Sequence, residues 1–140
     1  RYAYVVFPDV NVSAMPSLCS SWPVTILQQT ASTLAVSNRD GKLIQAAFFE
    51  PGRLAWGRGS SIEVEAPCLV TLDSTADAVR LHMADPTHMR KAMTLRLAGR
   101  YLGGQTKYDQ GNGQTELTVS LPQEGSAGRT VSLELRHENP

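Results

Sequence analysis

The stretch that decides the fold is "TELTVSLPQEGSAGRTVSLELR", residues 115–136. Leu117, Val119 and Leu121 alternate with polar side chains, and after a Gly-containing segment the alternation returns at positions 131, 133 and 135. Strict alternation of this kind is typical of an antiparallel strand with one face buried and one face in solvent. The glycines between the two halves predict a turn. We therefore predict a closing pair of half-buried strands.

The same alternation covers most of the chain. Residues 92–101 place Met93, Leu95 and Leu97 on one side, and "NRDGK" at 38–42 carries the Asp-Gly dipeptide that favours a hairpin turn. We find no amphipathic helix of ten residues or more. About ten short strands with Gly-rich turns predict an all-β fold, an antiparallel β-sandwich. The other expected strands are 2–7, 24–29, 33–38, 43–49, 61–65, 67–73 and 77–84.

The length of 140 residues suits about one domain. Residues 8–23 are polar and bounded by prolines, so they read as a linker. We therefore expect residues 1–20 to be the last strand of a preceding β-domain plus a linker, and residues 21–140 to be the sandwich. The chain opens on "RYAYVVF" without Met, so we expect a piece of a longer protein, with strand 2–7 poorly paired here.

Composition argues against several classes of partner. The chain has 13 basic and 13 acidic residues, so no overall field attracts nucleic acid or an anionic membrane. No apolar run approaches the roughly 20 residues of a membrane helix. Cys19 and Cys68 are predicted to be separate thiols, each buried or half-buried, with a disulfide as the alternative in an exported protein. No C-x-x-C motif is present, so neither a zinc site nor a redox motif is predicted.

The stretch 80–97 concentrates histidine, methionine and aspartate, which raises the question of a metal or catalytic site. The alternation places His82 on a strand face and His88 in the connection, without acidic or thiolate partners at a ligand spacing. Asp85 precedes Pro86 and is interpreted as a turn cap. We predict two strands and the turn between them. The chain also lacks a G-x-S-x-G and a P-loop, so we predict no catalytic residue, no metal and no cofactor.

A run from Pro86 to Tyr108 contains basic residues and no acid. Arg96 and Arg100 lie on the solvent side of their predicted strand, and pairing with the strand that carries Arg80 would extend a basic surface. Arginine on a rigid strand suits carboxylate or sulfate groups because its fork binds them with two hydrogen bonds. The alternative is a mixed surface with acids on neighbouring strands.

The segment "PGRLAWGRGSS", residues 51–61, is read as a loop. It holds Trp56 between Arg53 and Arg58, which suits stacking on a sugar ring. The alternative is that Trp56 closes one end of the sandwich. Arg53, Trp56, Arg58, Arg96 and Arg100 are therefore the candidate substrate-binding residues.

Several strings taken together resemble polysaccharide lyase family 8, which contains hyaluronate, chondroitin AC and xanthan lyases. "RYAYVVFPDV" is similar to the end of that family's central β-domain. Residues 26–54, 64–89 and 115–136 are similar, in order, to successive parts of its C-terminal domain, although "LQQTASTLAV" departs from the usual pattern. The matching positions are Tyr2, Tyr4, Pro8, Phe48, Phe49, Ala84, Asp85, Pro86 and Thr87.

The resemblance implies a fragment of a larger secreted or periplasmic enzyme. Members of this family have an N-terminal α/α toroid, a central β-domain and a small C-terminal β-sandwich. Their catalytic Asn, His, Tyr and Arg belong to the toroid, so none is carried over here. The expected partners are the toroid, the central domain and an acidic polysaccharide cleaved by β-elimination. Two alternatives remain, a stand-alone carbohydrate-binding module and a protein-interaction sandwich; an apolar patch beside the N-terminus would favour the lyase fragment.

Overall fold

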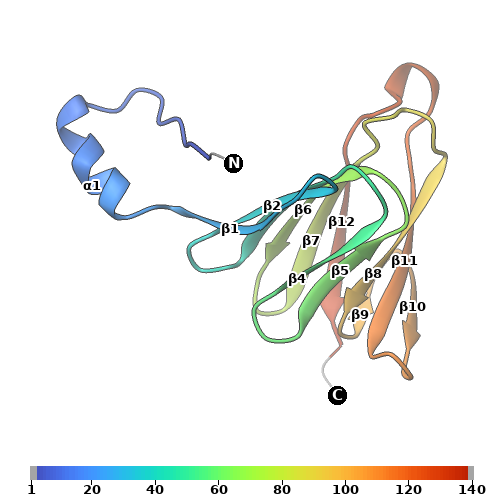
Figure 1. Cartoon of the computed structure of the whole chain (residues 1–140). Helices are drawn as coiled ribbons and strands as arrows, with labels where there is room; N and C mark the ends of the chain where they lie inside the picture. The colour runs from blue at the N-terminus through green and yellow to red at the C-terminus, as the bar shows by residue number, and fades with distance from the viewer. Residues whose placement is uncertain (1–2, 139–140) are drawn as a thin grey trace.

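The computed structural model describes residues 3–138, which fold into two antiparallel sheets packed face to face (Figure 1). The β-sandwich prediction is confirmed. The seven-stranded sheet has the order β1-β2-β3-β6-β7-β12-β9, and the five-stranded sheet has the order β10-β11-β8-β5-β4. The strands are β1 (Val24–Gln29), β2 (Thr33–Asn38), β3 (Leu43–Phe48), β4 (Gly52–Trp56), β5 (Ser60–Val64), β6 (Cys68–Ser74), β7 (Ala78–Ala84), β8 (Ala92–Ala98), β9 (Tyr101–Leu102), β10 (Gln105–Asp109), β11 (Gln114–Ser120) and β12 (Val131–His137).

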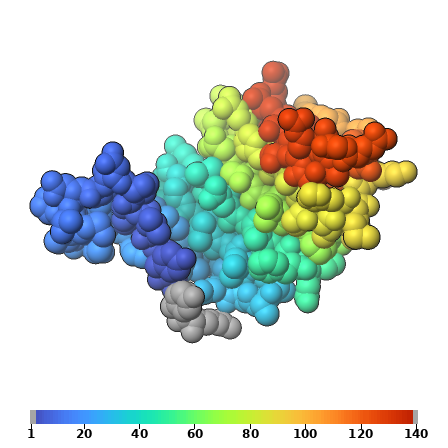
Figure 2. Space-filling view, turned by 90° about the horizontal axis from the view of Figure 1, so that it is seen from above, coloured from blue at the N-terminus to red at the C-terminus, as the bar shows by residue number. Residues whose placement is uncertain are grey.

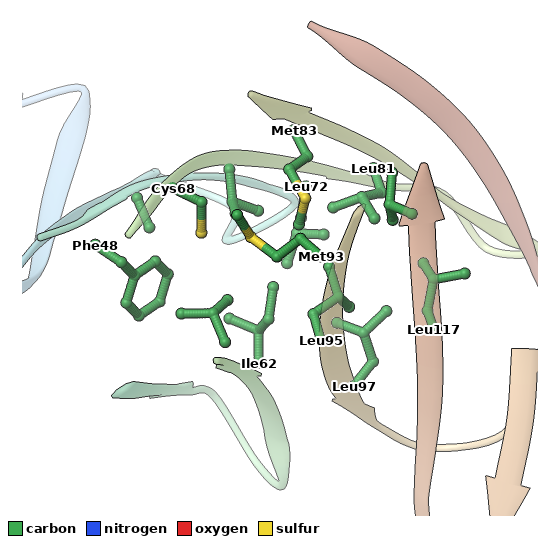
Figure 3. Packing of buried hydrophobic residues seen from close by; sticks show 14 of the residues in the cluster. Phe48, Ile62, Cys68, Leu72, Leu81, Met83, Met93, Leu95, Leu97 and Leu117 are labelled. Carbon is green, nitrogen blue, oxygen red and sulfur yellow. The ribbon is translucent and has the colours of Figure 1, made fainter. Parts of the chain in front are cut away.

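The core lies between the two sheets, where the inward side of each alternating strand meets the other sheet (Figure 3). Phe48 and Leu72 come from the seven-stranded sheet, and Met93, Leu95 and Leu117 come from the five-stranded sheet; all five are buried. Close packing of this kind gains both the transfer of apolar surface from water and dispersion contacts. The apolar side chains that the alternation placed inward are therefore the ones that hold the sheets together.

Three strands were not predicted: β4, β9 and β10. The prediction of a loop over 51–61 is wrong across β4, of which only Leu54 is buried. β10 lies at a sheet edge and has no buried side chain, and β9 has two residues. An edge strand with so little apolar surface carries no clear alternation, which explains why the pattern missed these elements.

The two longest connections between the sheets lie at the same end of the sandwich, and we call them the first and second crossing connections. The two strands predicted within 80–97 are confirmed as parts of β7 and β8. They do not pair as a hairpin, because residues 85–91 link β7 of the seven-stranded sheet to β8 of the five-stranded sheet. Residues 121–130, which include the 3₁₀ turn η2 (Glu124–Ser126), likewise separate β11 from β12. Both segments are long enough to cross the roughly 10 Å between packed sheets, whereas a tight turn would keep the strands paired.

Asp85 fastens the first connection, as the turn-cap interpretation predicted. Its carboxylate accepts hydrogen bonds from the Thr87 N–H at 2.8 Å and hydroxyl at 2.6 Å, from the Met89 N–H at 3.1 Å and from the Arg90 N–H at 3.0 Å. The side chain is only 2% exposed. The connection then binds the second one, since the Leu121 N–H donates to the Lys91 carbonyl at 2.9 Å.

The N-terminal segment contains a 3₁₀ turn, η1 (Val12–Ala14), and a short helix, α1 (Met15–Ser20). Figures 1 and 2 show it extending away from the sheets. Residues 3–7 form no strand in the described chain, so the strand predicted at 2–7 is wrong over these positions, in line with the expectation of poor pairing. Tyr2, with which that strand was to begin, lies outside the described residues. The boundary at residues 20 and 21 stays a prediction.

The two cysteines are separate thiols, as predicted, and Cys68 is buried. The prediction of burial is wrong for Cys19, which is exposed because it lies on α1, away from the sheets. Burial, and secondly the charge of Asp85, raise the pKa of Cys68 to about 12. A thiol reacts as its thiolate, and a buried thiol is also out of reach of reagents.

We therefore expect Ellman's reagent to titrate one thiol per folded chain at neutral pH and two after denaturation. Cys19→Ser should leave the folded chain unreactive. Rapid labelling of the Cys19→Ser variant under native conditions would contradict the burial of Cys68.

Candidate functional site

The outer face of the five-stranded sheet carries a charged row that crosses all five strands. The register aligns Lys107 with Glu116, Glu116 with Arg96, Arg96 with Glu63, and Glu63 with Arg53. The signs alternate from one strand to the next. Arg96, at the centre, forms ion pairs with Glu116 at 2.9 Å and with Glu63 at 3.5 Å. Opposite charges at directly facing positions stabilise a sheet modestly.

This row bears on two of the candidate substrate-binding residues. Arg96 already has a carboxylate on each side, which is the arrangement of the mixed-surface alternative. Arg53 lies at the free edge of the sheet, where one guanidinium nitrogen donates to the Ser61 hydroxyl at 3.3 Å. A polymer that bound Arg96 would have to displace a glutamate, whereas Arg53 has no ion pair in the described residues. Contact with polymer stays a prediction for both.

The basic surface expected from Arg80 and Arg96 together does not form. Arg80 lies on β7 and Arg96 on β8, so the two belong to different sheets and face opposite sides of the sandwich. Arg80 pairs with Glu134 at 3.5 Å. Arg100 pairs with Glu138 at 2.6 Å and lies 5.2 Å from the centre of the Tyr108 ring. Each of these arginines thus has a local acidic partner.

A cleft of about 530 Å³ opens between the sheets at the end of the sandwich opposite the two crossing connections. We call it the end cleft. Trp56 lines it from β4, Tyr101 from β9 and His137 from the end of β12. Trp56 is half-buried and packs against the core, as the alternative of a tryptophan closing the sandwich predicted, yet it also borders this opening. Arg58 lies in the exposed turn after β4 and does not line the cleft.

The β2–β3 turn forms one wall of the end cleft and contributes Arg39, Asp40 and Lys42. Sequence reasoning missed these residues, as well as Tyr101. The signal was present in "NRDGK", which brings two cations and one acid into a hairpin turn, but the turn was read only for its backbone. A turn at the end of a sandwich is also where binding residues of this architecture commonly lie.

The histidines and acids do not assemble into a catalytic or metal-binding group within residues 3–138. His82 shares a hydrogen bond of 2.8 Å with the Ser132 hydroxyl on the outer face of the seven-stranded sheet. His88 lies in the connection, and its ring packs over Gly128. His137 is at the other end, with its ring 4.8 Å from that of Tyr101. No group of three or more potential metal ligands occurs in the described part of the chain.

The outer face of the seven-stranded sheet is apolar near β1, β2, β3 and β6. We define this apolar face by Ile26, Leu34, Val36, Ala47 and Leu69. Leu34 is 44% exposed and Leu69 is 48% exposed, and the face is hollowed by about 450 Å³. The sequence signal was a loss of alternation, because apolar residues follow one another at 34–36 and 68–70. Contiguous exposed apolar surface is typical of interaction sites in proteins.

Comparison with known families decides where this sandwich belongs. Residues 25–94 match the family model of "Polysaccharide lyase family 8, C-terminal beta-sandwich domain". The chain belongs to polysaccharide lyase family 8. The match begins at β1 and runs into β8, so it covers both the apolar face and the first crossing connection. A comparison with curated proteins found no match.

Solved lyase structures share this fold. A chondroitinase AC lyase, studied in complexes with oligosaccharides, is 25% identical over 89% of the family 8 chain, with a TM-score of 0.70. A Paenibacillus xanthan lyase is 16% identical over 94%, with a TM-score of 0.72. A Streptomyces coelicolor A3 chondroitin AC lyase in complex with chondroitin sulphate is 16% identical over 92%, with a TM-score of 0.65.

The family 8 chain spans only a small part of these structures: 17% of both chondroitin AC lyases and 13% of the xanthan lyase. Within the described residues, no helix has the length and apolar character needed to cross a membrane. The similarity therefore covers one small domain of these enzymes and not their activity or substrate.

Proposed function

We propose that this chain is the non-catalytic C-terminal β-sandwich of an enzyme that cleaves acidic polysaccharide by β-elimination. The match to the C-terminal domain of polysaccharide lyase family 8 carries the proposal. In such a reaction a base removes the proton at C5 of a uronic acid, and the 4-linked sugar leaves. The histidines of residues 3–138 lie apart, on one outer face and at the two ends of the sandwich, which supports a role outside the chemical step.

The proposed role is that of a scaffold, and the apolar face is the surface that docks on the rest of the enzyme. This face lies on β1, β2, β3 and β6, and β1 follows directly after the N-terminal segment. That segment itself exposes apolar side chains, with Val6 at 71% and Val12 at 83% exposure. The N-terminal segment and the apolar face next to it thus both expose apolar side chains. This supports contact with a preceding domain, which would remove these side chains from water.

Polymer contact is the second part of the proposed role. Arg53, Trp56 and Arg58 all belong to the β4–β5 hairpin at an edge of the sandwich, with Arg53 on the outer face and Trp56 at the end cleft, whereas Arg96 and Arg100 are paired with glutamates. The hairpin therefore suits contact with an acidic chain better than the centre of the sheet does. Because the polymer is too large to enter a cell, we also infer an extracellular or periplasmic location.

The test is a lyase assay of the 140-residue chain beside its parent enzyme, with chondroitin sulphate, hyaluronan and xanthan as substrates. We expect the isolated chain to give no rise in the ultraviolet absorbance of the unsaturated product, and the parent to give one with at least one polymer. Elimination activity in the isolated chain would contradict the non-catalytic role. A parent without activity on any acidic polymer would contradict the proposed lyase.

A further inference from the structure

The end cleft has features that the scaffold role does not use. Its floor is the edge of the core, where Leu27, Trp56 and Tyr101 pack against the buried cluster. Its volume of about 530 Å³ falls within the range of small-molecule sites in proteins. Aromatic rings at the floor and polar groups at the rim are the usual composition of such sites. The cleft is thus built like a ligand site rather than like a flat docking surface.

The aromatic side of the cleft is held in place by the fold. The Tyr101 N–H donates to the buried Thr115 hydroxyl at 3.0 Å, and that hydroxyl donates to the Gly99 carbonyl at 2.8 Å. The Tyr101 ring packs against Gly99, where an added Cβ would lie 3.2 Å from the ring. On its other side, the ring is 4.8 Å from that of His137. Tyr101 therefore needs no reordering to receive a ligand, which lowers the entropic cost of binding.

The charged side of the cleft is the β2–β3 turn, and this turn is also well ordered by hydrogen bonds. The Asn38 side-chain oxygen accepts from the Leu43 N–H at 3.0 Å, and the Asp40 carboxylate accepts from the Lys42 N–H at 3.1 Å. The Asp40 carboxylate is thus turned toward its own backbone. Arg39 and Lys42 form no ion pair among the described residues, so both cations at the rim are available.

From this geometry we propose that the end cleft binds an acidic saccharide. The apolar side of a sugar ring lies against Trp56 and Tyr101, and its carboxylate or sulfate is held by Arg39 and Lys42. The inference rests on the proposed function only for the choice of polymer: a family 8 lyase works among acidic polysaccharides, and this cleft offers them a second contact away from any catalytic group. Charge-assisted hydrogen bonds from two cations favour an anionic ligand over a neutral one.

The experiment uses the chain with Trp22→Phe. The chain has two tryptophans, so Trp56 alone then reports on the cleft by its fluorescence. Hyaluronan tetrasaccharide carries only carboxylates, chondroitin sulphate tetrasaccharide also carries sulfates, and cellotetraose is neutral. We expect a saturable change in Trp56 emission with the acidic saccharides, weakened by salt. A response to both acidic probes would identify the carboxylate as the group that the cleft binds. A response to the sulphated probe alone would identify the sulfate.

Substitutions distinguish binding in the end cleft from non-specific electrostatic attraction of an acidic saccharide to the chain. Arg39→Gln with Lys42→Gln is expected to weaken binding about tenfold, since each removes a charge-assisted hydrogen bond. Lys91→Gln with Arg129→Gln is the matched control, because it also removes one lysine and one arginine charge, from exposed positions in the two connections at the other end of the sandwich. Trp56→Phe removes the fluorescent reporter, so its binding is measured by titration calorimetry beside the parent chain. It keeps an aromatic ring at the core edge and should weaken binding while leaving the melting temperature close to that of the parent chain.

The inference is overturned if neither acidic tetrasaccharide changes Trp56 emission, if cellotetraose binds equally well, or if the control with Lys91→Gln and Arg129→Gln loses as much affinity as the variant with Arg39→Gln and Lys42→Gln. These outcomes leave the lyase assay untouched. A catalytically inactive chain that binds no saccharide contradicts the cleft alone, whereas elimination activity in the isolated chain contradicts the proposed function.

Discussion

Replacing Asp85 with alanine is expected to lower the free energy of unfolding by about 3–4 kcal/mol. The carboxylate accepts four hydrogen bonds, from two groups of Thr87 and from the N–H groups of Met89 and Arg90, and the side chain is 2% exposed. Without it, these four donors of the first crossing connection lose the buried acceptor that they share. Urea denaturation followed by Trp fluorescence measures the change.

The matched control is Asp109→Ala. Asp109 caps a turn in the same way, accepting from the Gly111 N–H at 2.9 Å and from the Asn112 side chain at 2.6 Å, but it is exposed to solvent. Water replaces its hydrogen bonds, so we expect a far smaller loss. Equal losses in the two variants would show that Asp85 does not fasten the connection.

The pH dependence of the Asp85 effect has a definite sign. Burial acts to raise the pKa of Asp85, but hydrogen bonds from Thr87, Arg90 and Met89 outweigh it and hold the pKa below its ordinary value. A carboxylate with a lowered pKa in the folded state contributes stability above its unfolded pKa of about 4, and loses it as the pH falls through the folded value. The stability difference between the parent chain and Asp85→Ala should therefore be constant near neutrality and shrink below about pH 4.

Local pattern predicted most of the strands because each central strand buries one face. Leu95 on β8 and Leu117 on β11 are buried, while the polar residues next to them in each strand lie on the outer face, as the alternation indicated. The pattern also interpreted Asp85 correctly, since an Asp-Pro pair after a strand predicts a capped turn. These inferences needed only neighbouring residues and the period of two.

Pattern could not predict which sheet a strand joins. β7 and β8 read as a hairpin, yet the seven residues from 85 to 91 carry the chain across the core. The same limit applied to the sites. Along the chain, Glu63 is 33 residues and Glu116 is 20 residues from Arg96. Only the register of β5, β8 and β11 brings the two glutamates to either side of Arg96. Likewise, Trp56, Tyr101 and Lys42 line one cleft only because three turns, far apart in the sequence, lie at the same end of the sandwich.

Replacing Gly103 with alanine is the second change for which we expect a large loss, of about 3 kcal/mol. Gly103 joins β9 to β10 with a φ of +136°, a conformation that side chains rarely adopt. An added Cβ would lie 2.6 Å from the Glu134 carbonyl oxygen and 3.5 Å from the Leu135 Cα. Both neighbours are backbone atoms of β12, so relief requires moving a strand whose Leu135 side chain is fully buried in the core.

Gly59→Ala separates the clash from backbone strain. Gly59 also has a positive φ, of +81°, but an added Cβ there would meet nothing within 4 Å. This control carries only the strain of the left-handed conformation, about 1–2 kcal/mol. Amide exchange adds a readout of position, since Gly103→Ala should speed exchange in β12 and Gly59→Ala should not. If the two variants unfold at the same urea concentration and β12 keeps its protection, then β12 does not constrain Gly103. In that case the close approach of Gly103 to β12 does not stabilise the β9 edge of the seven-stranded sheet.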